Sequence, residues 1–176
     1  MKFYAGIGSR ETPEKVCKNM TQLAQDLMEV GYILRSGGAT GADTAFELKI
    51  GNPGYKEIWL PWEGFNNNPS KLFLPSTLER YPVCKQAIEI AKKYHPTWDK
   101  LKYGAQRMMV RNVFQVYGKM LQYPVDFIVC WTKDGKATGG TGQAIRIAMD
   151  NNIPVFNLFH DYAELDLVRL ADLVPF

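Results

Sequence analysis

The sequence predicts an α/β fold: one doubly wound domain with a mostly parallel sheet of about five strands and helices on both faces. Two observations favour it. Short apolar segments alternate along the chain with amphipathic segments of helical period, and glycine-rich segments follow three of the apolar runs. The chain has 176 residues, of which 46% are hydrophobic and 22% charged. This composition is typical of a globular protein, and we expect a single domain over residues 1–176.

The first half of the chain is predicted to alternate strands with helices. Residues 2–7 form a short apolar strand, and Thr12 is the expected N-cap of a helix that starts at Pro13 and ends at Gly31. Residues 32–35 form a second strand, residues 41–50 a helix and residues 56–60 a third strand. The helix at 13–31 has one apolar face, formed by Val16, Met20, Leu23, Ala24, Leu27 and Met28.

The alternation is interrupted at residues 62–82, which combine three consecutive asparagines with prolines, glycines and aromatic residues. We expect a long loop or small insertion there, and we hypothesise that Trp62 and Phe65 form one wall of a ligand pocket. Helices are predicted at 83–94 and 104–121. The segment 125–131 is the most apolar strand and is therefore expected to be central. A helix at 139–151, a strand at 154–158 and a closing helix at 161–173 follow.

Composition and residue counts narrow the function. The net charge of +3 permits an anionic ligand but does not by itself indicate nucleic acid. The N-terminal segment is unlike a signal peptide and no apolar run reaches eighteen residues, so we expect a cytoplasmic protein without a membrane partner. Cys130 lies in an apolar run and is expected to be a buried, unreactive thiol. His95 and His160 lack metal-ligand spacing, so neither a metal nor a cofactor is predicted.

Three glycine-rich segments follow predicted strands, and the carboxyl ends of parallel strands lie at one edge of a sheet. Free N–H groups at the helix starts, together with small side chains, are suited to binding phosphate. The candidate binding residues are Gly8, Ser9 and Arg10 in the first segment; Ser36, Gly37, Gly38, Thr40, Gly41 and Asp43 in the second; and Thr138, Gly139, Gly140, Thr141 and Gly142 in the third. Each segment alone could equally be an ordinary turn.

Two better-known phosphate motifs do not fit. Glu11 occupies the position of the third glycine of a dinucleotide-binding fingerprint, and Asp43 occupies the position of the P-loop lysine. Asp43 itself has two possible roles. It can form a capping box with Thr40, or it can accept a hydrogen bond from a ribose hydroxyl or a base.

Two parts of the sequence carry a family resemblance. GSR after the first strand and SGGATGAD after the second, with Glu47 downstream, resemble the SLOG superfamily of Rossmann-like nucleotide-binding proteins and its YspA/YpsA-type branch. The segment MVRN at 109–112, the strand at 125–131 and TGGTGQAIRIAMDNNIPVFNL resemble the DNA-processing protein A (Smf) branch. The resemblance covers most of the chain except residues 62 to about 100.

The resemblance implies a nucleotide or phosphate pocket at the three glycine-rich segments, in a Rossmann-like fold. It also implies phosphate clamps at Arg10, Arg107 and Arg111, with Asn112 adjacent, and a homo-oligomer. The residues alone leave another interpretation open, because Arg107 and Arg111 are four positions apart and could form a solvated or salt-bridged helix face.

Three functions remain open. We favour nucleotide binding, and the alternatives are N-glycosidic hydrolysis of a nucleotide and single-stranded DNA binding. Lonely Guy-type phosphoribohydrolases carry PGGxGTxxE, but here Arg146, expected at the surface, replaces the final glutamate. Asp43 and Glu47 are then the candidate catalytic carboxylates. The resemblance to the DNA-processing branch implies a single-stranded DNA partner in recombination. One segment contains the basic and aromatic residues that such a site needs: Lys92, Lys93, Tyr94, Trp98, Lys100 and Lys102.

Overall fold

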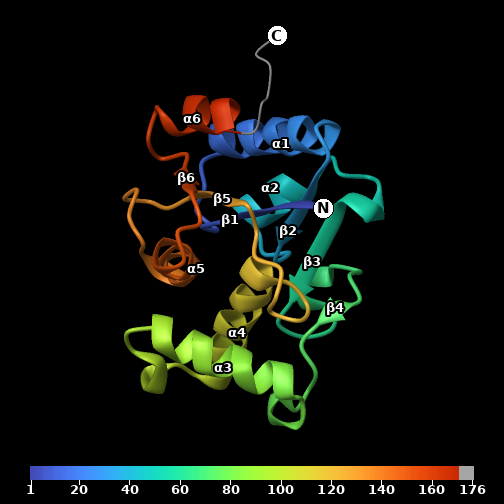
Figure 1. Cartoon of the computed structure of the whole chain (residues 1–176), viewed down its shortest axis with the longest axis vertical. Coiled ribbons are helices and arrows are strands. Elements are labelled where there is room, and N and C mark those ends of the chain that lie inside the picture. Colours follow the sequence, from blue (N-terminus) through green and yellow to red (C-terminus); the bar gives the residue numbers. More distant parts are fainter. Residues whose placement is uncertain (171–176) are drawn as a thin grey trace.

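The computed structural model describes residues 1–170, which form one parallel sheet between two layers of helices (Figure 1). The strands are β1 (Lys2–Gly8), β2 (Tyr32–Ser36), β3 (Lys56–Leu60), β4 (Leu72–Phe73), β5 (Phe127–Trp131) and β6 (Val155–Asn157). The helices are α1 (Glu14–Glu29), α2 (Ala42–Glu47), α3 (Pro82–Tyr94), α4 (Tyr103–Tyr117), α5 (Gly139–Asp150) and α6 (Ala163–Leu170). The predicted doubly wound α/β fold is confirmed.

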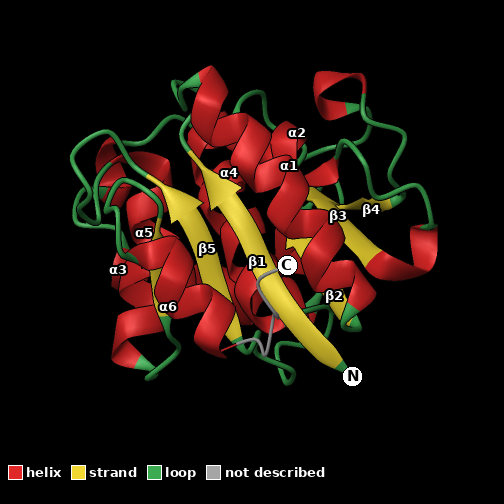
Figure 2. Cartoon of the chain, turned by 90° about the horizontal axis from the view of Figure 1, so that it is seen from above, coloured by secondary structure: helices red, strands yellow, loops and turns green. Residues whose placement is uncertain are grey.

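Within residues 1–170 the sheet has six strands in the order β4-β3-β2-β1-β5-β6, and every neighbouring pair is parallel. The chain moves outward from β1 to β4, then returns past β1 and continues with β5 and β6. The strand order therefore reverses between β1 and β5, which lie side by side with their arrowheads at the same edge (Figure 2). In open parallel sheets this reversal point is where ligands bind.

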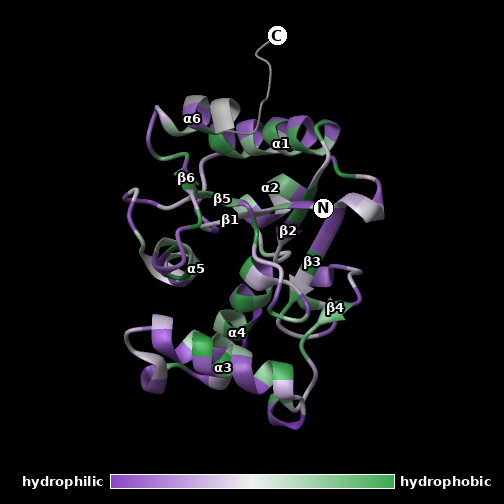
Figure 3. Cartoon of the chain, viewed as in Figure 1, coloured by the Kyte–Doolittle hydropathy of each residue, from purple (hydrophilic) through white to green (hydrophobic). Residues whose placement is uncertain are grey.

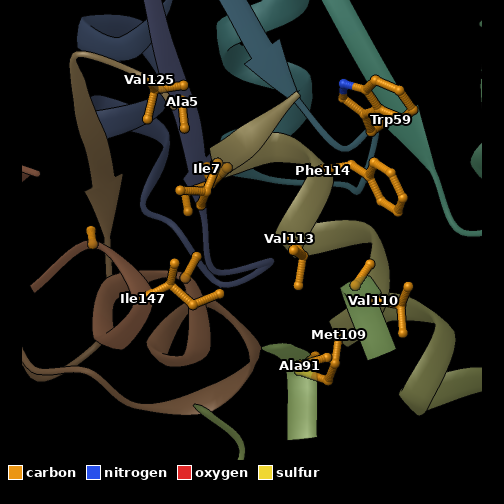
Figure 4. Close-up of a cluster of buried hydrophobic side chains, with 14 of the residues drawn as sticks. Ala5, Ile7, Trp59, Ala91, Met109, Val110, Val113, Phe114, Val125 and Ile147 are labelled. Atoms are coloured by element: carbon orange, nitrogen blue, oxygen red, sulfur yellow. The ribbon is translucent and has the colours of Figure 1, made fainter. Parts of the chain in front are cut away.

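Alternating side chains on the inner strands supply two apolar cores. Tyr4 of β1 and Phe127 of β5 point into the core beneath α1, α2 and α6, whereas Ala5 and Ile128 point into the core beneath α3, α4 and α5. This second core appears in Figure 4, where Ile7 of β1 lies above residues of α4 and α5. Both faces of the sheet are thus covered, as expected for parallel strands.

Helix α4 lies between α3 and the sheet, and most of its residues after Met108 are buried. Its Phe114 ring stacks on Trp59 of β3 with centroids 5.1 Å apart (Figure 4). The outer helices α1 and α3 carry hydrophilic residues along their length in Figure 3. Because α4 is held on both sides, its remaining polar side chains are fixed in position near the carboxyl ends of β1 and β5.

Several predicted details are wrong. Residues 62–82, predicted as a long loop or small insertion, include β4, which pairs with β3 and forms one edge of the sheet. Helix α1 starts one residue later than predicted: Pro13 is its N-cap, and Thr12 Oγ1 donates instead to the Ser9 carbonyl at 2.7 Å. Helix α4 ends at Tyr117 because Gly118 has a positive φ of 72°.

The two remaining differences concern β5 and the chain end. Strand β5 is fully buried and is an inner strand, but β2 and β1 occupy the two middle positions of the order. The predicted closing helix at 161–173 corresponds to α6. The last three residues of that prediction, 171–173, lie outside the described part of the chain. None of the helices described in residues 1–170 has the length and apolar content required to cross a bilayer.

The prediction that Cys130 is buried is confirmed. The residue has no exposed surface in β5, and burial raises the pKa of its thiol to about 12. A thiol with this pKa stays protonated at neutral pH and is a poor nucleophile.

Candidate functional site

A cavity of about 490 Å³ lies at the reversal point, against the carboxyl ends of β1 and β5. Five segments line it: the loop after β1, the second glycine-rich segment at Ala39 and Asp43, the loop after β5, the first turn of α5 and one face of α4. Ten predicted binding residues are among its lining: Gly8, Ser9, Arg10, Asp43, Arg111, Asn112, Thr138, Gly139, Gly140 and Thr141. Its volume is in the range of small-molecule sites in proteins.

Helix α4 contributes a polar stripe to this cavity. Met108, Arg111, Asn112 and Gln115 are spaced by three and four residues, so they lie on one face of the helix, and all four line the cavity. The sequence interpretation missed Met108 and Gln115. Extending the helical period one turn beyond Arg111 would have identified Gln115.

Arg111 and Asp43 form a buried ion pair at the floor of the cavity. Arg111 Nη1 lies 3.3 Å from Asp43 Oδ2, and each side chain is 4% exposed. Asp43 Oδ2 also accepts from the backbone N–H of Ala39 at 3.3 Å. Burial raises the pKa of Asp43, while the nearby Arg111 charge acts in the opposite direction. Burial likewise lowers the pKa of Arg111, and the Asp43 charge opposes that shift.

This pair differs from the capping box considered for Asp43. The N-cap of α2 is Gly41, without a side-chain cap, so Thr40 and Asp43 do not form a capping box. The carboxylate is instead held inside the protein by Arg111 and by backbone N–H groups of the first and second glycine-rich segments, Gly8 and Ala39. Asp43 therefore orients Arg111 at the cavity floor.

Gly37 and Gly41 of the second glycine-rich segment lie against other parts of the protein. A Cβ at Gly37 would overlap the Arg111 guanidinium, and one at Gly41 would lie 2.6 Å from the Ser9 carbonyl oxygen. Ser36 Oγ donates to the Gly6 carbonyl at 2.6 Å. None of the predicted residues Ser36, Gly37, Gly38, Thr40 and Gly41 lines the cavity.

The third glycine-rich segment is open at its start, at Gly139, and packed at its end, where a Cβ at Gly142 would lie 2.4 Å from the Ala137 carbonyl. Gly139 has a φ of 62°, and a Cβ there would meet nothing within 4 Å. Thr138 is the N-cap of α5 without a side-chain cap, and Gly142 N–H is the first to donate within the helix, to Thr138 O at 2.9 Å. The N–H groups of residues 139–141 therefore have no acceptor within the helix. Gly142 itself does not line the cavity.

Two side chains fix the start of α5. Asn112 Nδ2 donates to the Gly140 carbonyl and to Gln143 Oε1, each at 3.1 Å. Arg146 was expected at the surface but is half-buried, and it donates to the Ala137 and Tyr94 carbonyls at 2.8 Å. The open N–H groups are thus held in one orientation.

Exposed charges surround the cavity mouth. Arg10 is exposed at the end of the first glycine-rich segment, and Lys133 is exposed after β5. Lys133 Nζ lies 3.2 Å from Glu11 Oε2, with both side chains largely in solvent. An exposed pair of this kind is weak, so Lys133 can exchange Glu11 for an anionic ligand.

Arg107 and Glu47 lie outside the cavity. Arg107 is buried and donates to the carbonyls of Pro61, Leu74 and Ser76, so it anchors residues 61–76. Glu47 pairs with Lys56 at 3.3 Å and accepts from Asn68 Nδ2 at 2.8 Å. Both side chains have full structural roles where they lie.

The hypothesis that Trp62 and Phe65 form a wall of the pocket is not supported. The two rings pack edge to face with centroids 5.1 Å apart, and neither lines the cavity. The same segment covers the second glycine-rich segment instead, with Asn66 Nδ2 donating to the Gly38 carbonyl at 3.0 Å. Within residues 1–170 there is also no group of three or more His, Cys, Asp or Glu residues placed to hold a metal ion.

Comparison with solved structures shows a similar fold in DNA processing protein A from Helicobacter pylori, a protein described for its single-stranded DNA binding mode. The two chains are 21% identical and superpose with a TM-score of 0.55. The match covers 89% of this chain and 64% of the Helicobacter pylori chain, so this chain spans less than two thirds of that protein. No protein-family model and no curated protein matches the sequence.

Proposed function

We propose that the protein binds a nucleotide or nucleotide derivative, with the anionic part at the mouth of the cavity. The observation that carries this proposal is the convergence of the open helix N–H groups at residues 139–141 with the exposed Arg10 and Lys133 side chains. Helix N-termini and cationic side chains are common phosphate-binding groups in proteins. The reversal point of a parallel sheet is where such ligands bind in other α/β proteins.

The direct test is a binding panel of nucleoside 5′-monophosphates against the wild-type protein and Gly140→Asp. An aspartate in the first turn of α5 suits the helix dipole, so the fold is retained, but its charge repels a phosphate. We expect at least a tenfold loss of affinity. Gly51→Asp is the matched control, because Gly51 is exposed, has open space around it and lies outside the cavity. Equal affinities for the two variants would contradict the proposal.

We propose binding without hydrolysis. The position that carries the catalytic glutamate in Lonely Guy-type enzymes is Arg146 here, whose guanidinium is engaged by backbone carbonyls. Of the two candidate catalytic carboxylates, Glu47 lies outside the cavity and Asp43 is paired with Arg111. Chromatography of nucleoside monophosphates incubated with the protein should show no released base. Release that is lost on Asp43→Asn would establish the enzyme instead.

Single-stranded DNA binding is the second candidate, supported by the similarity to DNA processing protein A and by one groove. A groove of about 580 Å³ between α3 and α4 is lined by Trp98, Tyr103, Lys85 and Lys92, a combination that can stack bases beside phosphates. Lys92 and Lys93 are paired with Glu89 and Asp150, at 3.0 and 2.9 Å, which reduces the available positive charge.

A salt titration of oligo(dT) binding separates the two candidates. A DNA-binding groove should give a steep loss of affinity with salt, and Trp98→Ala should weaken DNA binding while leaving mononucleotide binding unchanged. The predicted homo-oligomer is tested in the same samples by light scattering with and without DNA.

A further inference from the structure

Two buried hydrogen-bond donors at the cavity floor have no partner. Among the described residues, four buried side-chain polar atoms lack a hydrogen bond, and two of them, Arg111 Nε and Gln115 Nε2, belong to residues that line this cavity. Arg111 is 4% exposed and Gln115 is 1% exposed. Buried donors are rarely left unpaired in proteins, and an unpaired one calls for an explanation such as a ligand that completes the site.

The neighbouring polar groups have their partners within the protein. Asn112 Nδ2 is used by Gly140 and Gln143, and Gln143 Nε2 donates to the Ala91 carbonyl at 3.2 Å. Thr132, also at the floor, accepts from Asn157 Nδ2 at 2.7 Å. The lack of a partner is therefore specific to the Arg111 and Gln115 donors and is not a general property of this region.

The acceptor at the floor is occupied as well. The Asp43 carboxylate accepts from Arg111 and from the backbone N–H of Ala39 and Gly8. The floor thus offers donors in excess of acceptors. An amide can rotate to present its oxygen, but Arg111 Nε is a donor in every orientation.

The mouth and the floor of the cavity also differ in polarity. Its mouth has the exposed Arg10 and Lys133 and the open turn of α5, whereas Ile7 and Met109 at the floor are 4% and 8% exposed. An anionic group is favoured at the mouth, where water and cations are available. A flat, apolar group with acceptors on its edge is favoured at the floor.

We propose that the floor recognises the carbonyl edge of a nucleobase, with Gln115 as the specificity-determining residue. The inference rests on the proposed nucleotide-binding function and adds the chemical class of the base. Guanine and hypoxanthine present O6 and N7 as two adjacent acceptors, and uracil presents O4. Adenine and cytosine carry an exocyclic amino donor at the corresponding position, which would face Arg111 Nε donor to donor and would require the Gln115 amide to turn its oxygen towards the base.

The test measures the affinities of GMP, IMP and UMP against AMP and CMP for the wild-type protein, Gln115→Met and Gln115→Glu. We expect the wild-type protein to bind the carbonyl-bearing nucleotides roughly tenfold more tightly, as typical for one well-made base contact. Gln115→Met removes the amide at similar volume and should reduce this preference to within about twofold. Gln115→Glu supplies acceptors and should shift the preference towards AMP and CMP.

A second readout separates recognition from a structural role. Because Gln115 Nε2 makes no hydrogen bond within the protein, the ligand-free Gln115→Met variant should melt at the same temperature as the wild-type protein or higher. A lower melting temperature would show that the amide supports the fold and would contradict the inference.

The binding outcomes distinguish the two proposals. Binding of all five nucleotides with equal affinity, or a carbonyl preference that survives in Gln115→Met, overturns the base-recognition inference and leaves the proposed function standing. No binding of any nucleotide at millimolar concentration overturns the proposed function and the inference with it.

Discussion

The second and third glycine-rich segments, residues 36–43 and 138–142, have similar compositions but different surroundings. Gly37 and Gly41 of the second segment are pressed against Arg111 and the backbone at Ser9, whereas Gly139 of the third has open space around it. Residues 61–76 cover the second segment, and the cavity adjoins the third. Glycine permits close approach in both places, and tertiary packing decides whether the approaching group is protein or ligand.

The largest expected effect comes from breaking the contact between the second segment and α4. Arg111→Met leaves Asp43 as an unpaired buried carboxylate, which we expect to lower the free energy of unfolding by about 3–5 kcal/mol. Denaturant unfolding at pH 7 measures this loss. The double variant Arg111→Met/Asp43→Asn should recover part of it, because the stranded charge is then absent. A loss below about 1 kcal/mol would mean that the pair contributes little to holding the second segment.

The loss of stability in the single variant Arg111→Met, relative to the wild-type protein, should be smaller in acid. Burial raises the pKa of Asp43, and removing Arg111 removes the charge that opposes this shift. The folded state then binds a proton more readily than the unfolded state, so stability falls as pH rises through the folded-state pKa. We expect the difference in free energy of unfolding between the variant and the wild-type protein to be smaller at pH 5 than at pH 7. A deficit that is constant with pH would indicate that Asp43 is not the origin of the loss.

A matched pair of glycine substitutions tests the difference between the segments directly. Gly41 and Gly139 both have positive φ, 84° and 62°, so alanine is strained at either position. Only at Gly41 would the new methyl group also meet backbone atoms of Ser9 and Arg10, within 3 Å. We expect Gly41→Ala to cost about 3 kcal/mol and Gly139→Ala about 1 kcal/mol. Equal costs would show that the two segments are packed alike.

The cover over the second segment should contribute a smaller amount. Asn66→Ala removes the hydrogen bond to the Gly38 carbonyl, and Asn67→Ala is its control. Both asparagines have a left-handed backbone, with φ of 53° and 55°. Within residues 1–170 the Asn67 side chain makes no hydrogen bond. We expect Asn66→Ala to be about 1 kcal/mol less stable than Asn67→Ala in chemical unfolding. Identical values would mean that the bond does not secure the segment.

The sequence predicts the architecture well because hydrophobic period and strand-helix alternation are local signals. The strands at 2–7, 32–35 and 56–60 and the edge on which the glycine-rich segments lie follow from them. Strand β4 is missed because it has only two residues and owes its pairing to β3, not to an apolar pattern.

The site is predicted less completely, because its composition depends on contacts distant in sequence. Arg107 and Arg111 look equivalent along α4, yet one binds carbonyls of residues 61–76 and the other faces the cavity. Asp43 finds its partner 68 positions away. Gln115 carries no motif, and only the burial of its unpaired amide distinguishes it from other polar residues.

The smallest effect on stability is expected at the third segment itself. In Gly140→Ala the new Cβ lies 3.3 Å from Met109 Cε, the end of a flexible side chain that can move aside, and alanine has a higher helix propensity than glycine. These contributions have opposite signs, so the free energy of unfolding should change by less than about 0.5 kcal/mol. The methyl group is nevertheless added to the lining of the cavity, so nucleotide affinity measured by calorimetry should fall several-fold. A destabilisation above about 1 kcal/mol with unchanged affinity would reverse the distinction between the two segments, because the third would then be the packed one.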